Sequence, residues 1–288
     1  MSPQIASRPR LQSRRSFLGV VPAAVGLVAA GGIRGVFGRS EPVPVRGADP
    51  EALSPSERLH LPRLRLPAFT SNGAKVPVAV EMSHPMEPGH SITRISIVNA
   101  RDPVPLKGVF HFTPRNGQVY VAFQIRLDHG ASEVAATAEC SRHARWHATR
   151  SITIPDGAGG CAGTAPPPDR AGRDEIGPPA IRIPQLIADG GIAPDQTIDV
   201  QVKTKHPSRT GLEVREGTFV QAGEPLYLNG MNVFYGDAQV SQFTMTSALS
   251  DNPLVAFRLR VHSEDLLRVV LTNNRGQRFE AAHRIRFS

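Results

Sequence analysis

The sequence predicts an all-β protein built of two antiparallel β-sandwich domains in tandem. Short apolar segments alternate with turn signals along most of the 288 residues, and none shows a sustained helical period of 3.6 residues. A Gly- and Pro-rich stretch near the middle separates two strand-rich regions. The expected divisions are therefore an export signal at 1–40, a first sandwich at 41–155, a linker at 156–180 and a second sandwich at 181–288.

The first 40 residues have the pattern of a twin-arginine export signal. Arg14 and Arg15 are followed by Phe17 and then by an apolar, Ala- and Gly-rich run from Val20 to Gly32. This run is shorter than the roughly 20 strongly apolar residues of a transmembrane helix. We expect cleavage near Ala30, a periplasmic location and no stable membrane insertion afterwards, with an uncleaved anchor as the alternative.

The charge of the chain does not favour a nucleic-acid partner. The formal net charge is +8, but six of the 33 Lys and Arg residues lie in residues 1–40, which contain no Asp or Glu. The remaining 27 basic residues face 25 acidic ones. A nearly neutral body has little attraction for phosphate, so we expect no nucleic-acid binding.

The region before the linker begins with an expected leader, which is followed by a series of strand patterns. Residues 41–65 have no clear period and are expected to pack on the first sandwich. Alternating apolar segments, bounded by turn signals such as Asn116-Gly117, follow at Val76–Glu81, Ile92–Ile97, Val109–Phe112, Val119–Leu127, Val134–Ala138 and Thr149–Ile154.

The region after the linker has the same character. Ile198–Thr204 and Leu254–Val261 alternate cleanly, and Asn273–Gly276 joins Leu267–Leu271 to Phe279–Phe287 as a closing hairpin. Short strands in both regions suit two immunoglobulin-like sandwiches.

Cys161 is the candidate functional residue. It stands in the run Asp156–Gly163, where Gly159, Gly160 and Gly163 are expected to make a slim, flexible and exposed arm. An exposed thiol has a pKa near 8.5, and the run contains no Lys, Arg or His to lower it. We therefore expect a covalent attachment point rather than a catalytic nucleophile; a structural disulfide with Cys140 is the alternative.

The other cysteine and the histidines give weaker signals. Cys140 is expected to be a buried core residue, a disulfide or resolving partner of Cys161, or a metal ligand with His143 and His147. Two His four residues apart share a face only on a helix, and this region is expected to be a hairpin.

Two His-Pro motifs are weaker candidates. Met82–Met86 has the ligand types of a copper site, but we interpret it and His206-Pro207 as strand ends followed by Pro turns. We expect no metal, no cofactor and no enzymatic activity, since the chain lacks a Walker loop, a CxxC pair, a GxSxG elbow and a haem CxxCH.

Several motifs resemble the sulfur-carrier proteins SoxY and SoxZ, here fused in one chain. Those of the SoxY half are Val76–Val78, His84–Met86, Phe110–Pro114, Ile125–Leu127 and Gly159–Cys161. Those of the SoxZ half are Ile181–Pro184, Val202–Gly211, Asn252-Pro253 and Asn273–Gly276.

The resemblance implies a carrier whose cysteine thiol is joined to thiosulfate or a related species and is presented to partner enzymes. Only Cys161 matches the attachment position. The chain departs from the SoxY and SoxZ patterns in three ways. Its cysteine arm continues into a second domain, Ala162 stands where the SoxY pattern has a glycine, and Ser208-Arg209 stands where the SoxZ pattern has Met-Glu. Single-chain fusions of this type resemble a subgroup associated with periplasmic quinoprotein (PQQ-dependent) dehydrogenases. The alternatives are therefore an assembly module for such a dehydrogenase and a redox pair formed by the two cysteines.

Overall fold

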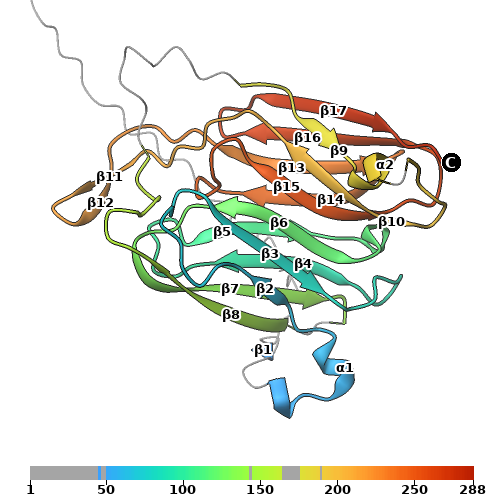
Figure 1. The fold of residues 1–288 in the computed structure, drawn as a ribbon, viewed down its shortest axis with the longest axis horizontal. Helices are drawn as coiled ribbons and strands as arrows, with labels where there is room; N and C mark the ends of the chain where they lie inside the picture. The colour runs from blue at the N-terminus through green and yellow to red at the C-terminus, as the bar shows by residue number, and fades with distance from the viewer. Residues whose placement is uncertain (1–44, 47–49, 143–144, 164–175, 189) are drawn as a thin grey trace, which may run out of the picture. The chain divides into compact units, whose positions relative to one another are not determined.

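The computed structural model describes residues 45–46, 50–142, 145–163, 176–188 and 190–288. These residues belong to the unit Pro42–Ser288. The expected export signal and residues 164–175 of the expected linker lie outside the described residues. Most of the described elements are strands in two large sheets and one small hairpin, which confirms the all-β fold class (Figure 1).

The larger sheet has nine strands in the order β1-β8-β7-β4-β5-β14-β13-β16-β17. Its strands in that order are Val45–Arg46, Arg145–Ile154, Gly130–Cys140, Ile92–Val98, Leu106–His111, Ala238–Met245, Leu228–Tyr235, Leu266–Asn273 and Arg278–Arg284. All neighbours are antiparallel except β1 and β8, which are parallel.

The smaller sheet has six strands in the order β2-β3-β6-β15-β10-β9, and β11 pairs with β12 separately. The six are Arg63–Arg65, Val76–Met82, Val119–Ile125, Leu254–Arg260, Thr197–Lys203 and Ala180–Arg182, and the hairpin is Leu212–Arg215 with Thr218–Gln221. The helices are short: 3-10 turns η1 (Pro50–Ala52) and η2 (Pro114–Asn116), and helices α1 (Pro55–Arg58) and α2 (Pro184–Ala188). Within the described ranges, no helix has the length and apolar character needed to cross a membrane.

The alternation in the sequence corresponds to burial in the strands. In β3 the side chains of Val76, Val78, Val80 and Met82 are buried, while those between them are partly or fully exposed. Side chains of a strand point alternately to its two faces, so one face packs into the sandwich and the other meets solvent. The expected closing hairpin forms as β16 and β17.

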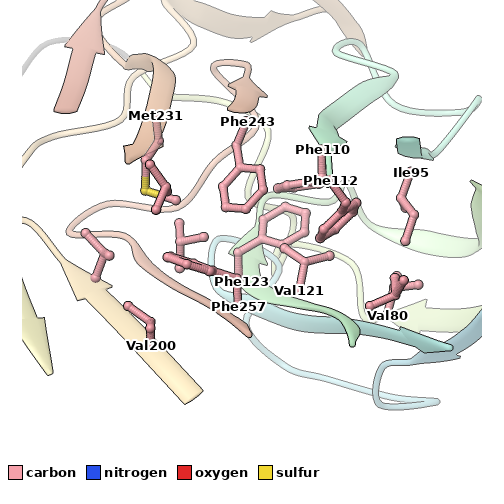
Figure 2. Packing of buried hydrophobic residues seen from close by; sticks show 14 of the residues in the cluster. Val80, Ile95, Phe110, Phe112, Val121, Phe123, Val200, Met231, Phe243 and Phe257 are labelled. Atoms are coloured by element: carbon pink, nitrogen blue, oxygen red, sulfur yellow. The ribbon is translucent and has the colours of Figure 1, made fainter. Parts of the chain in front are cut away.

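The two halves of the chain share both sheets. Strand β5 of the first half pairs with β14 of the second, and β6 pairs with β15, so the strands of the two halves lie side by side (Figure 1). Four aromatic side chains pack across this junction: the ring centroids are 4.9 Å apart for Phe110–Phe123, 5.1 Å for Phe110–Phe243 and 5.6 Å for Phe243–Phe257. Figure 2 shows these rings within one continuous apolar core. The two sandwiches are therefore fused edge to edge.

Candidate functional site

Residues 155–163, here called the Cys161 segment, leave β8 and run along the end of the first half. Backbone hydrogen bonds hold the segment there. Gly73 N donates to Ala158 O and Gly160 N donates to Leu127 O, both at 2.8 Å. The segment is thus an ordered part of the fold, and the expectation of a flexible arm is corrected for residues 155–163.

The glycines of the segment permit close packing. A Cβ on Gly160 would come within 3.0 Å of the backbone of Gly73 and Ala74, and a Cβ on Gly159 would lie 2.7 Å from Asp128 Oδ1. Real side chains do not reach such distances, because carbon atoms in contact are about 3.5–4.0 Å apart. Gly163 differs, since a Cβ there would make only ordinary contacts, the nearest at 3.4 Å. Gly159 and Gly160 therefore allow the backbone of the segment to pack closely against the first half, and they do not make the segment flexible.

The second half of the chain closes over the segment from the other side. Thr210 Oγ1 donates to Cys161 O at 2.8 Å. Gly163 N donates to Leu212 O at 3.0 Å, and Gly211 N donates to Gly163 O at 2.8 Å. The Thr-Gly turn that resembles the SoxZ pattern thus meets the Gly-Gly-Cys run that resembles the SoxY pattern.

Arg126 joins the segment to the second half. Its guanidinium donates to Gly160 O at 3.1 Å and to Ser208 O at 2.7 Å, and it forms an ion pair with Asp251 at 2.9 Å. The arginine is only 6% exposed, so these charge-assisted bonds are formed mostly away from water. The sequence does not mark Arg126 as a site residue, because its partners lie far from it along the chain.

The Cys161 thiol is buried, with 2% of the residue exposed. Burial raises the pKa of the thiol to about 12; Asp102 and Asp128 also raise it, while Lys107 and Arg126 lower it. The expectation of an exposed thiol is therefore wrong for this state of the protein. A segment slim enough to enter a partner is also slim enough to fit between the two halves of its own chain.

Cys140 and Cys161 are both free and buried. Cys140 ends the 11-residue strand β7, whereas the Cys161 segment contacts Asp128 and His129, next to the start of that strand. A strand of this length spans roughly 35 Å, and a disulfide requires Cα atoms within about 7 Å. The expectation that Cys140 is a disulfide or resolving partner is therefore corrected.

The remaining sequence candidates have separate surroundings. Met82 and Met86 are buried in the apolar core, and His206 is buried beside Asn273, whose Nδ2 lies 3.1 Å from its Nε2. His147 Nδ1 lies 3.0 Å from Thr137 Oγ1. His143 lies outside the described residues.

The structure brings Cys140 together with three histidines instead. The ligand atoms of His60, His84, His90 and Cys140 all lie within 4.8 Å of one another. Burial lowers the pKa of His84 to about 4 and also lowers that of His60, with neighbouring imidazoles contributing in both cases. The sequence pointed to the Met82–Met86 motif, which contains His84, and to Cys140 as separate candidate metal ligands, but it paired Cys140 with His143 and His147. It did not indicate His60, which lies in the leader outside any recognisable motif, and only the tertiary structure brings these residues together.

The fold and the segment define a two-sandwich β protein that holds one thiol at the junction of its halves. Family models identify these halves: the model described as sulfur oxidation protein SoxY matches residues 55–161, and that described as sulphur oxidation protein SoxZ matches residues 190–284. The chain therefore belongs to the sulfur-oxidation proteins as a fused SoxY–SoxZ type, with a carrier role in sulfur oxidation. The SoxY match ends at Cys161.

Solved structures give weaker likenesses. The superoxide reductase (neelaredoxin) from Ignicoccus hospitalis is 24% identical over 36% of this chain and 89% of its own, with a TM-score of 0.33. The sulfur carrier protein SoxY from Chlorobium limicola f thiosulfatophilum is 20% identical over 39% and 86%, with a TM-score of 0.28. Fibronectin(III)-like modules of CbhA from Clostridium thermocellum are 6% identical over 78% and 94%, with a TM-score of 0.21. No curated protein matches the sequence.

Proposed function

We propose that this chain is a periplasmic, non-catalytic carrier that holds a thiosulfate-type adduct on Cys161 and presents it to sulfur-oxidising enzymes. The observation that carries the proposal is the position of Cys161. It is the last residue of the SoxY match, and it lies where Arg126 and Thr210 bind the segment from the two halves. The twin arginines Arg14 and Arg15 support export.

The attachment reaction requires an oxidant. Joining thiosulfate to the thiol forms one sulfur–sulfur bond, gives R–S–S–SO3⁻ and releases one proton and two electrons. The electrons pass to a partner oxidoreductase. Tetrathionate loads the thiol without a further oxidant, because the thiolate attacks its central sulfur–sulfur bond and displaces thiosulfate, so tetrathionate is itself reduced.

The buried thiol requires release of the Cys161 segment before loading. Release breaks the bonds that Gly160 and Gly163 make to both halves, and those that Arg126 and Thr210 make to the segment. A partner enzyme that binds the released segment shifts this equilibrium by its differential affinity for the released state. Loading is therefore controlled by the partner, and the docked thiol is protected from other periplasmic oxidants.

The test is intact-mass spectrometry of the exported chain after incubation with tetrathionate and after isolation from cells that oxidise thiosulfate. From active cells we expect one thiosulfate-type adduct per chain, removable by reductant, on wild type and on Cys140→Ala. Tetrathionate alone should load the same thiol slowly, because Cys161 is buried until its segment is released. Cys161→Ala should carry none. An adduct that persists in Cys161→Ala, or a wild-type chain that never acquires one in active cells, contradicts the carrier proposal.

The burial of Cys161 favours one alternative, an assembly module for a periplasmic quinoprotein dehydrogenase. In that case the cysteine only fills the junction. Cys161→Ala would then leave the associated dehydrogenase activity intact, whereas a charged substitution on the exposed face of the sandwich would abolish it.

Export is tested separately by cell fractionation. Replacement of Arg14 and Arg15 by Lys should retain the chain in the cytoplasm, whereas replacement of Arg8 and Arg10 should not. Unchanged export of the Arg14 and Arg15 variant contradicts the twin-arginine route.

A further inference from the structure

We propose that the SoxY half holds a divalent transition-metal ion between the three imidazoles of His60, His84 and His90 and the sulfur of Cys140. This site is distinct from Cys161 and does not depend on the proposed carrier function. Three imidazole nitrogens with one thiolate are a donor set that suits ions of borderline softness, such as Zn²⁺ and Fe²⁺.

The distances between the donors fit a single ion. His84 Nε2 lies 3.0 Å from His60 Nε2, 3.1 Å from His90 Nε2 and 3.8 Å from Cys140 Sγ. Metal–nitrogen bonds of about 2.0–2.1 Å place two nitrogens about 2.9 Å apart at a right angle and about 3.4 Å apart at a tetrahedral angle. The two nitrogen separations from His84 lie between these values, and all four donor atoms lie within 4.8 Å of one another. An ion at the centre of the cluster therefore requires only small side-chain movements.

The hydrogen bonds behind the rings set which nitrogens point inward. His60 Nδ1 lies 3.0 Å from Ser56 O, and His84 Nδ1 lies 2.6 Å from Pro85 O. A carbonyl only accepts, so each Nδ1 carries the proton and each neutral ring presents the lone pair of Nε2 to the cluster. Two such lone pairs 3.0 Å apart repel one another, and a shared cation removes this repulsion. Backbone carbonyls in this position are also the usual outer partners of metal-binding histidines.

The four donors come from three segments that the fold brings together. His60 follows helix α1, whose Ser54 and Glu57 form a capping box. His84 and His90 lie in the turn between β3 and β4, and Cys140 ends β7. An ion at this site would link the leader to the sandwich, because it would bind His60 of the leader together with three donors of the sandwich. Among the described residues, His60 is the only donor that the leader contributes.

The site is shielded on one side and accessible on the other. His84 and Cys140 are 2% and 4% exposed, while His60 and His90 are half-buried. The ring of Trp146 stacks on His60 with centroids 4.9 Å apart and an interplanar angle of 25°. An ion can therefore reach the cluster from the side of His60 and His90, while His84 and Cys140 are the buried donors.

The first experiment measures the metal content of the full exported chain by elemental mass spectrometry. The protein is produced in cells grown with added Zn²⁺ or Fe²⁺, and loosely bound ions are removed before the measurement. We expect about one ion per chain. The double variant His84→Ala/His90→Ala should lose it, whereas His147→Ala, a nearby histidine outside the cluster, should keep it. A chain without bound metal, or a double variant that binds as wild type does, overturns the proposal.

The second experiment identifies the sulfur donor by Co²⁺ reconstitution. Wild type and Cys161→Ala should both give an intense near-ultraviolet thiolate-to-cobalt band, and Cys140→Ser should not. A band that disappears with Cys161→Ala overturns the assignment. Because the Cys140 or histidine variants can misfold, thermal unfolding of chelator-treated wild type is compared before and after Zn²⁺ is added back. A higher Tm on addition is expected, and an unchanged Tm contradicts the site. A negative result for the carrier function would not affect these experiments. The intact-mass test detects an adduct on Cys161, whereas the metal experiments detect an ion at Cys140 and the histidines.

Discussion

Replacement of Gly160 by Ala tests whether tight backbone packing keeps the Cys161 thiol buried. A methyl group there would come within 3.0 Å of the backbone of Gly73 and Ala74. No side-chain movement relieves such an overlap, because the opposing atoms belong to the main chain. We expect the variant to release the Cys161 segment while both sheets remain folded, since the segment lies outside their hydrogen-bonded ladders.

The magnitude follows from the state of the thiol. Burial raises the pKa of Cys161 to about 12 when the segment is docked, and a released thiol has a pKa near 8.5. At pH 8 the thiolate fraction therefore increases from about one in ten thousand to about one in four, and only the thiolate reacts. Alkylation of Cys161 should accelerate by about two-thousandfold.

The assay is the time course of iodoacetamide alkylation, followed by peptide mapping that separates the Cys161 peptide from the Cys140 peptide. Gly163→Ala is the matched control, because its Cβ would make only ordinary contacts in the same segment. It should react as slowly as wild type. The reasoning is refuted if Gly160→Ala reacts no faster than wild type, or if wild type already reacts at the rate of a free cysteine.

Three further predictions concern stability. First, burial raises the pKa of Cys161 to about 12, above the value near 8.5 of a free thiol. Its contribution to the free energy of unfolding is therefore fully present below about pH 8.5 and is lost as the pH rises toward 12. Urea unfolding at pH 8 and pH 10.5 should show this loss in wild type and a flatter response in Cys161→Ala, and equal responses would contradict it. Second, Arg126→Met leaves Gly160 O and Ser208 O without their buried donor and should lower the free energy of unfolding by about 2–4 kcal/mol, whereas an unchanged urea midpoint would argue against this role. Third, Phe243→Ala removes a ring at the junction of the halves and should cost about 3–5 kcal/mol in a single calorimetric transition; two separate transitions would mean that the halves unfold independently.

The strands were predictable because their signal is local. The alternation of Val76, Val78 and Val80 determines which face of β3 is buried, whatever strand lies beside it. The sequence also shows the glycine run, but it does not show whether the run is flexible or tightly packed. Gly160 is compatible with a free arm or with a close backbone contact, and only the position of Gly73 and Ala74 decides between the two.

The sequence by itself determined the all-β class, the separation of two strand-rich regions by a Gly- and Pro-rich stretch, and the position of Cys161 in a glycine run, because periodicity and glycine content are properties of neighbouring residues. The resemblance of short motifs to SoxY and SoxZ then identified the two regions. The tertiary structure decided that β5 pairs with β14, that Cys161 is buried between the halves, and that His60, His84 and His90 meet at Cys140. These contacts join residues far apart in the chain. Their formation depends on how the sheets pack as a whole, and local sequence patterns do not specify that packing.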